Sequence, residues 1–246
     1  MQTFYFTDPG KVRSHNEDNV TIVNKNNKEF VLAIADGMGG HKAGEVASSI
    51  AIEHIINSFN DIETIGPKEN AINWLRTIVK EINDKIFKYA EKNPESKGLG
   101  TTLVIAIKTE DYILYGNIGD SSGFVIKNEI LHKVTKDHTY VGMLINSGKL
   151  SEENAKNHPG KNLLTRALGA NNPIEIDIFD IDTSVKGLFL CSDGLTNMLT
   201  QEQIEKTLNS NLSIEEAVIR LIKKANSRGG TDNISIAYLK KESGEL

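Results

Sequence analysis

The architecture of this chain is governed by residues 30–41, FVLAIADGMGGH, where an apolar run ends in an aspartate and a cluster of glycines. The run Phe30–Ala35 is typical of a strand buried in a core. The glycines after Asp36 permit a tight turn and allow the backbone to approach a ligand closely. Apolar residues at helical spacing between Val46 and Phe59 predict that a helix follows this turn.

Three further aspartates stand beside apolar runs. Asp120 ends YGNIGD, Asp193 ends LFLCSD, and Asp232 precedes NISIAYL. Carboxylates do not gather at the rim of an apolar core without a counter-charge, because their desolvation is costly. Hard oxygen ligands select Mg²⁺ or Mn²⁺. A tight strand-to-helix turn explains the glycines but not the repeated acidic residues, so the pattern predicts a metal-dependent hydrolase.

Composition and charge exclude several classes of protein. The 246 residues are 39% hydrophobic and 25% charged, which is ordinary for a globular chain with a core. A net charge of −5 provides no basic surface for nucleic acid or an anionic membrane. No apolar run approaches the roughly 20 residues of a membrane span, and MQTFYFTDPG is unlike a secretory signal. We therefore expect a cytoplasmic monomer with no nucleic-acid or membrane partner.

Cys191 is the only cysteine, so the chain has no internal disulfide, which suits a reducing compartment. It lies within the apolar run GLFLCSD. We interpret it as a small buried hydrophobe rather than a nucleophile, because no neighbouring cation or base is available to stabilise a thiolate.

Periodicity predicts many hairpin strands and a few helices. Apolar spacing predicts helices over 46–59 and 72–86, and capping boxes at Thr200 and Ser213 predict two more. Strands are predicted over 3–7, 19–24, 30–35, 101–108, 112–118, 124–126, 130–134, 174–181, 188–191 and 234–239.

This pattern lacks regular βαβ alternation and favours an α+β fold, two stacked antiparallel sheets flanked by helices on both sides. No linker divides the chain, so we expect one domain, residues 1–246. Residues 139–170 lose strand periodicity and are predicted to form a helical or loop insertion within it.

The polar segment DPGKVRSHNED, residues 8–18, precedes a predicted strand. Taken alone, it is best interpreted as a solvated turn. Beside the clustered aspartates it has a functional interpretation. Arg13 carries the planar fork that binds phosphate oxygens in pairs, and Glu17 and Asp18 have carboxylates able to orient metal-bound waters.

Together these motifs resemble the bacterial branch of the metal-dependent serine/threonine protein phosphatases, type 2C. The eight matching strings follow the family's order and extend over almost the whole chain, which makes the resemblance specific. They are TDPGKVRSHNED (7–18), ADGMGGHKAGEVAS (35–48), GLGTTLV (98–104), GNIGDSS (116–122), KDHTYV (136–141), LTRALG (164–169), LCSDGLTNML (190–199) and GGTDNISI (229–236).

The resemblance implies the same sandwich of two antiparallel sheets and a set of metal ligands. Asp36 would bridge two cations, and the backbone carbonyl of Gly37 would join the second site. Asp193 and Asp232 would complete the first site. Asp120, together with Asp193, would hold a third, weaker ion.

The resemblance also implies roles for groups around the ions. Glu17 and Asp18 would hold metal-bound waters, and Arg13 would bind the substrate phosphate. Residues 139–170 would form a flap beside the active site.

The activity implied is hydrolysis of phosphoserine and phosphothreonine in proteins. Two Mn²⁺ or Mg²⁺ ions would ionise a bridging water that attacks phosphorus directly, without a phosphoenzyme. Phosphorylated proteins would be the partners, and the enzyme would oppose a bacterial serine/threonine kinase. Two alternatives stay open. A silent phosphoprotein-binding member is disfavoured by the intact carboxylates, and hydrolysis of small phosphate esters fits the open rim of the family less well.

The chain departs from the family at two positions. Met38 stands where some members have a histidine, so the proton donor to the leaving group is open. His41 is one candidate, a metal-bound water is another, and His41 is also interpretable as a loop residue that shapes the cleft. Ser122 replaces an arginine that often follows the Gly-Asp-Ser motif. His138 is expected to have a structural or cleft-lining role.

Overall fold

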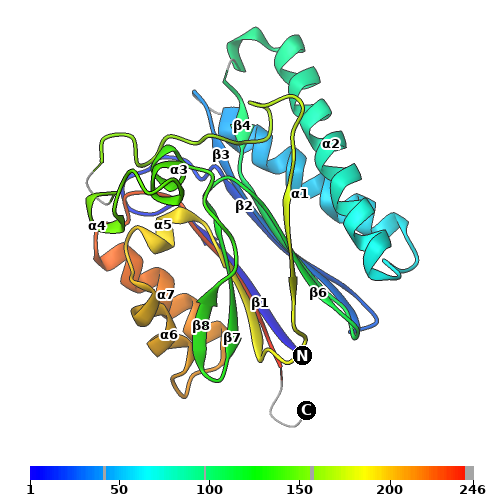
Figure 1. Cartoon of the computed structure of the whole chain (residues 1–246), viewed down its shortest axis with the longest axis vertical. Coiled ribbons are helices and arrows are strands. Elements are labelled where there is room, and N and C mark those ends of the chain that lie inside the picture. Colours follow the sequence, from blue (N-terminus) through cyan, green and yellow to red (C-terminus); the bar gives the residue numbers. More distant parts are fainter. Residues whose placement is uncertain (41–42, 97, 156–157, 242–246) are drawn as a thin grey trace.

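In the computed structural model, which describes residues 1–40, 43–96, 98–155 and 158–241, two β-sheets lie face to face (Figure 1). Helices α1 (Ala43–Asp61) and α2 (Lys68–Lys92) cover the outer face of one sheet. Helices α6 (Gln201–Leu208) and α7 (Ile214–Ser227) cover the other. The predicted α+β arrangement of two stacked antiparallel sheets with helices on both sides is confirmed.

Both sheets are antiparallel throughout. The first sheet has the order β1 (Gln2–Asp8), β11 (Ile234–Lys240), β10 (Gly187–Cys191), β7 (Ser122–Lys127) and β8 (Ile130–Lys133). The second has the order β2 (Asp18–Lys25), β3 (Glu29–Met38), β5 (Leu103–Lys108), β6 (Ile113–Ile118) and β9 (Asp177–Ile181), and β4 (Gly100–Thr101) pairs with the end of β3.

Short helices complete the description. They are the 3-10 helix η1 (Pro94–Ser96), α3 (Tyr140–Asn146), α4 (Glu152–Ala155) and α5 (Asp193–Thr196). The capping box predicted at Ser213 is present, because its hydroxyl accepts a hydrogen bond from the Glu216 N–H at 3.1 Å and the Glu216 carboxylate accepts one from the Ser213 N–H at 2.9 Å. The capping box predicted at Thr200 is also present. No helix of the described ranges is both long enough and apolar enough to cross a membrane.

Two predicted strands are shorter than expected. The strand predicted over 101–108 divides into β4 and β5 at Thr102, because the Asp36 N–H donates to the Thr102 hydroxyl at 3.1 Å in place of the Thr102 carbonyl, although the register with β3 continues on both sides. The strand predicted over 174–181 begins only at Asp177. Ile174 and Ile176 pack instead against the cluster beneath α1 and α2.

The two sheets meet through a buried layer that a tyrosine hydrogen bond crosses. The Tyr115 hydroxyl on β6 donates to the Phe124 carbonyl on β7 at 2.7 Å. Gly123 makes room for this ring, because a Cβ there would lie 2.7 Å from Tyr115 Cδ1. The sheets are thereby held at a separation and register that bring their ends together, where the candidate site lies.

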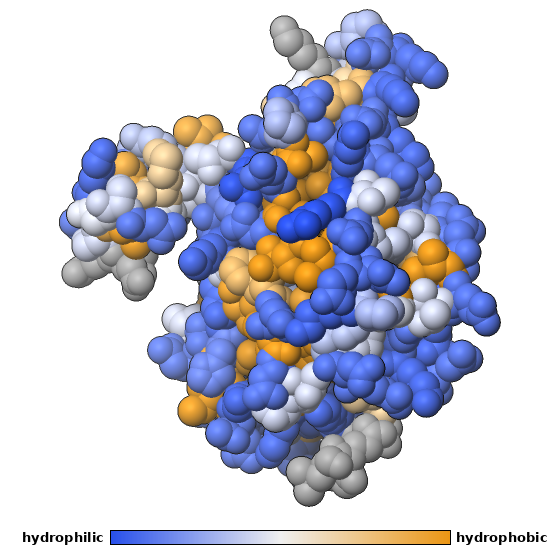
Figure 2. Space-filling model, turned by 45° about the vertical axis from the view of Figure 1, so that its right-hand side comes forward, coloured by the Kyte–Doolittle hydropathy of each residue, from blue (hydrophilic) through white to orange (hydrophobic). Residues whose placement is uncertain are grey.

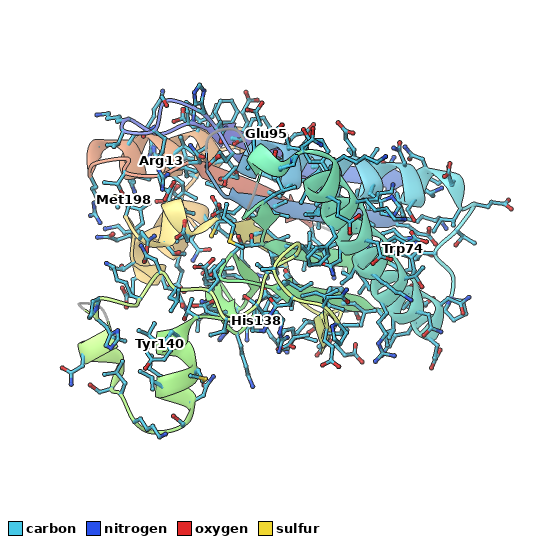
Figure 3. All side chains as sticks on the ribbon, turned by 90° about the horizontal axis from the view of Figure 1, so that it is seen from above. Arg13, Trp74, Glu95, His138, Tyr140 and Met198 are labelled. Carbon is cyan, nitrogen blue, oxygen red and sulfur yellow. The ribbon has the colours of Figure 1, made fainter. Side chains whose placement is uncertain are left out.

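The part of the segment 139–170 that carries α3 and α4 stands off from the sandwich as a lobe (left in Figure 2), whereas the returning end packs on the sandwich, where Leu168 is fully buried and pairs with Thr101. Figure 3 shows Tyr140 within this projecting segment. The two ends of the segment meet at its base, where the Tyr140 N–H donates to the Leu163 carbonyl at 2.8 Å and Thr139 bridges to Leu164. On the face seen in Figure 2, polar side chains predominate around a band of apolar ones.

The hydrogen bond between the sheets yields a stability prediction. Tyr115→Phe removes the hydroxyl that reaches Phe124, and we expect it to lower the free energy of unfolding by about 1 kcal/mol in urea titrations. The matched control is Tyr5→Phe on β1, whose side chain is exposed and which we expect to be neutral. Equal effects of the two substitutions would contradict this account.

Candidate metal centre

The structure brings the four aspartates around one pocket of about 490 Å³ at the end of the sandwich. Asp36 lies in β3 of the second sheet, and Asp120 lies in the turn that leads from β6 to β7. Asp193 follows β10 and begins α5, while Asp232 precedes β11, so both come from the first sheet. The site therefore forms only where the two sheets are packed together.

Burial and mutual repulsion dominate the electrostatics of this pocket. The carboxyl groups of Asp36 and Asp193 lie close enough to share a hydrogen bond. Burial, followed by the charges of Asp18, Asp193 and other carboxylates, raises the pKa of Asp36 well above its usual range. Burial and the charge of Asp193 raise the pKa of Asp120 to about 7. Ionising all these groups together requires a compensating positive charge.

Asp18 lies buried behind the pocket surface. Its Oδ2 accepts a hydrogen bond from the Ser192 hydroxyl at 2.7 Å, while its Oδ1 has no partner. Burial raises the pKa of Asp18 to about 7 against the hydrogen bonds from Ser192 and Ser235. The pKa of Glu17 is also raised, chiefly by burial, and Glu17 Oε1 is likewise buried without a partner.

The unpartnered oxygens of Glu17 and Asp18 bear on whether the pocket can hold a divalent cation. Among the described residues, no three His, Cys, Asp or Glu side chains close on one point as a complete coordination shell. Mg²⁺ is commonly held by one or two carboxylates and keeps several waters, so an incomplete protein shell suits it. The unpartnered oxygens of Glu17 and Asp18 offer acceptors for such waters. The donor set therefore fits hard divalent cations.

Gly37 is required by a close backbone approach rather than by an unusual dihedral angle. A Cβ at this position would lie 2.1 Å from the Gly44 carbonyl oxygen at the start of α1. The Gly37 N–H donates to the Glu17 carbonyl at 3.1 Å. The strand end, the N-terminal loop and the helix are thus held together at the pocket wall, which Gly37 lines.

Arg13 lies at the open side of the pocket. Its Nη2 is 2.9 Å from Asp232 Oδ2, and half of its side chain is exposed. Among the described residues that line the pocket, Arg13 and Arg166 are the only cations. Arg13 can therefore attract an anionic group towards the carboxylates while it partly offsets their charge.

Asn233 organises the N-terminal loop, a role that the sequence analysis missed. Its Nδ2 donates to the carbonyls of Pro9 and His15, each at 2.9 Å, and its Oδ1 accepts from the Glu17 N–H at 2.8 Å. This one amide thereby positions the segment that carries Arg13 and Glu17. The only signal in the sequence is an asparagine directly after Asp232, which by itself indicates no contact.

Thr102 was also missed. Its hydroxyl accepts from the Asp36 N–H at 3.1 Å and lies 2.9 Å from the Ser121 hydroxyl. It therefore connects the backbone of Asp36 to the residue next to Asp120. A threonine within an apolar strand gives no indication of this link.

Other residues singled out from the sequence have plain structural positions. Cys191 is fully buried, and burial raises the pKa of its thiol, so the interpretation as a small hydrophobe is confirmed. Met38 lines the pocket but has no proton to donate. Ser122 is buried in β7 opposite Cys191. His41 lies outside the described residues, and no histidine of the described chain lines the pocket.

Comparisons with known proteins agree with this fold. The family profile described as protein phosphatase 2C matches residues 11–230, and the chain belongs to that family. The serine/threonine phosphatase stp of Listeria monocytogenes is 39% identical over 243 residues, which is 98% of this chain and 96% of the relative.

Solved structures are similar over nearly the whole chain. The serine/threonine phosphatase of S. agalactiae has a TM-score of 0.93 at 31% identity, covering 98% of this chain and 99% of that one. The phosphatase of Mycobacterium tuberculosis has a TM-score of 0.87 at 32% identity, covering 98% and 99% of the two chains.

The raised pKa values predict how the metal-free protein responds to pH. A carboxyl group whose folded-state pKa is raised binds more protons in the folded state, so its contribution to stability is lost as pH rises through that pKa. Because Asp18 and Asp120 shift from 3.8 to about 7, we expect the chelator-treated protein to lose stability between these pH values.

Urea titrations in chelator at about pH 5 and about pH 8 measure this loss. Asp120→Asn removes one of the charges and is expected to raise stability in chelator at the higher pH by about 1–3 kcal/mol. Asp180→Asn on the exposed part of β9 is the control. A stability that rises steadily with pH in the chelated wild type would contradict the repulsion.

Proposed function

We propose that this protein is a type 2C serine/threonine protein phosphatase that hydrolyses phosphoserine and phosphothreonine with divalent cations held in the acidic pocket. The observation that carries the proposal is the meeting of Asp36, Asp193 and Asp232 from both sheets, with Arg13 beside them. Burial and mutual repulsion raise the pKa values of Asp36 and Asp193. Bound cations would offset this repulsion, and the ionised carboxylates would supply the negative charge that the cations require. A neighbouring guanidinium provides the recognition of phosphate.

The proposed ligands follow from this arrangement. Asp36, the Gly37 carbonyl, Asp193 and Asp232 would hold two Mn²⁺ or Mg²⁺ ions. Asp120 and Asp193 would hold a third, in line with the close coupling of their charges. When bound, such ions supply an activated water and neutralise charge on the phosphate.

The remaining steps belong to side chains of this chain. Glu17 and Asp18 would accept hydrogen bonds from ordered waters through their unpartnered oxygens, so that the attacking water is fixed in position. Arg13 would bind non-bridging phosphate oxygens and orient the phosphorus for in-line attack. The proton for the leaving serine or threonine oxygen would come from His41 or from a metal-bound water.

The surroundings of the pocket support a protein substrate. Residues 162–167, at the end of the segment 139–170, line the pocket, and the exposed side chain of Leu163 belongs to them. We propose that this segment is a flap which contacts the polypeptide around the phosphorylated residue. We further propose that the chain acts as a single-domain monomer in the cytoplasm and opposes a serine/threonine kinase.

The metal ligands give the first activity prediction. Asp193→Asn should lower the release of phosphate from a phosphothreonine peptide by about 100-fold or more, because the cations lose a charged ligand. Chelator should abolish the wild-type activity, and added Mn²⁺ should restore it. Asp180→Asn, which removes a surface carboxylate paired with Lys68, is the matched control and should be unchanged. Full activity of Asp193→Asn with Mn²⁺ present would refute the ligand assignment.

The proposed phosphate-binding role of Arg13 gives the second activity prediction. Arg13→Ala should raise KM for a phosphopeptide by about 10- to 100-fold, because it removes charge-assisted hydrogen bonds to the phosphate. Arg13→Lys should recover only part of the loss, since an ammonium cannot bind two oxygens as a planar fork does. Initial rates over a range of peptide concentrations separate KM from kcat. Unchanged KM in Arg13→Ala would exclude the role.

Substrate class separates the leading function from its alternatives. Rates on a phosphothreonine peptide and on a free sugar phosphate, measured at equal concentration with Mn²⁺, should favour the peptide. A preference for the sugar phosphate would indicate a small-ester hydrolase. Binding of phosphopeptide without turnover would indicate a silent binding module.

A further inference from the structure

His138 lies at the base of the projecting segment (Figure 3). It is buried, and each of its polar groups has a partner. Its backbone N–H donates to the Gly119 carbonyl at 2.9 Å, and its ring Nδ1 accepts from the Gly119 N–H at 3.1 Å. Its Nε2 lies 3.1 Å from Asp177 Oδ2. One histidine therefore clamps both peptide groups of Gly119 and extends to the edge strand β9.

The contacts fix the state of the ring. A backbone N–H can only donate, so Nδ1 is unprotonated and the proton of the neutral ring lies on Nε2. Nε2 donates this proton to Asp177, and the Arg166 Nη1, itself a donor, lies farther from Nε2 at 3.3 Å. Burial lowers the pKa of His138, which agrees with a neutral imidazole. Asp177 is held in turn by Arg166, whose Nη1 is 2.5 Å from its Oδ1. The ring is thus oriented from both sides.

Gly119 directly precedes Asp120 in the turn between the two sheets. Its φ of +100° is a backbone conformation that favours glycine, and a Cβ would lie 2.6 Å from the Thr102 side chain. The peptide group that joins Gly119 to Asp120 is the one whose carbonyl accepts from His138 and from Asn117 Nδ2. The direction in which the Asp120 carboxylate enters the pocket therefore depends on this clamp.

The same residue also joins the two ends of the segment 139–170. His138 immediately precedes Thr139, and its carbonyl accepts from the Thr165 N–H at 2.8 Å. Leu163 and Thr165, which line the pocket, lie on the returning end of the segment. A displacement of the segment at its base is thereby transmitted to Gly119 through a single side chain and its backbone.

We propose that His138 is a positioning residue that couples cation binding at Asp120 to the base of the segment 139–170 through its hydrogen bond from the Gly119 N–H. The proposal rests on the proposed function in that it assumes that Asp120 takes a divalent cation. His138 touches neither substrate nor ion, and it acts through the backbone that carries Asp120.

The test counts Mn²⁺ bound to the full chain by equilibrium dialysis, and the ion at Asp120 is defined as the one that Asp120→Asn loses. His138→Leu should weaken that ion by about 10- to 100-fold, as expected for loss of a group that orients a ligand, and leave the others within about twofold. His138→Asn should remain close to wild type, because its Oδ1 takes the place of Nδ1 and accepts from Gly119. His132→Leu, at an exposed histidine of β8, is the matched control.

Hydrogen exchange supplies a second readout that a general loss of stability does not imitate. Binding and segment order are linked reciprocally, so Mn²⁺ should slow amide exchange within 139–170 in the wild type and in His138→Asn. This protection should be absent in Asp120→Asn and His138→Leu. Where His138→Leu fails to fold, His138→Gln replaces it, because its amide reaches the position of Nε2 rather than Nδ1.

Several outcomes would overturn the proposal. If His138→Asn is as damaging as His138→Leu, or if His138→Leu weakens all bound ions equally, then His138 only supports the scaffold. A wild type with no ion sensitive to Asp120→Asn would also refute it, while phosphopeptide hydrolysis at the Asp36 centre would persist. Failure of the proposed function would instead appear as absent hydrolysis with the binding results unchanged.

Discussion

Repulsion between buried carboxylates is the constraint to which the rest of this structure responds. Asp18, Asp36, Asp120 and Asp193 are all placed where burial raises their pKa, and each adds to the repulsion felt by others. A core would not retain such a cluster for stability, because apolar residues of similar size would pack there at lower cost. The surrounding hydroxyl and amide groups hold the carboxylates in place, and Glu17 Oε1 and Asp18 Oδ1 have no hydrogen-bond partner. The protein thus keeps a site that is unfavourable alone and favourable once charge is compensated.

The division of the site between two sheets explains how such a cluster is built. Asp36 is carried by the second sheet, whereas Asp193 and Asp232 are carried by the first. Separate elements keep the acidic residues apart in the unfolded chain, and packing of the sheets brings them together. Asn233 and Thr102 then connect elements that are distant in sequence, from the N-terminal loop to the turn before β7. The site is carried by the sandwich, while the segment 139–170 is joined to it at the base of its lobe and through its returning end, where Leu168 pairs with Thr101.

At the base of that segment, His138 contacts the turn that carries Asp120 and the returning end of the segment. His138 accepts from Gly119 through its ring and donates to it through its backbone, and its carbonyl joins the returning end of the segment. Arg166 and Asp177 complete the arrangement at the edge of the second sheet. The chain belongs to the protein phosphatase 2C family, in keeping with the order of its motifs. It is the local hydrogen bonds that indicate how a peripheral lobe can influence a carboxylate in the pocket.

The sequence alone determined the strands, the main helices and the identity of the acidic residues, because apolar periodicity and capping boxes depend on neighbours in the chain. It also determined that Cys191 would be an inert buried side chain. Only the tertiary structure decided where β4 ends and β9 begins, because both boundaries depend on contacts with distant segments, such as the bond from the Asp36 N–H to the Thr102 hydroxyl. The tertiary structure likewise decided the roles of Asn233, Thr102 and His138. Their hydrogen bonds join residues far apart in the chain, and no local pattern records which distant backbone group a side chain will meet.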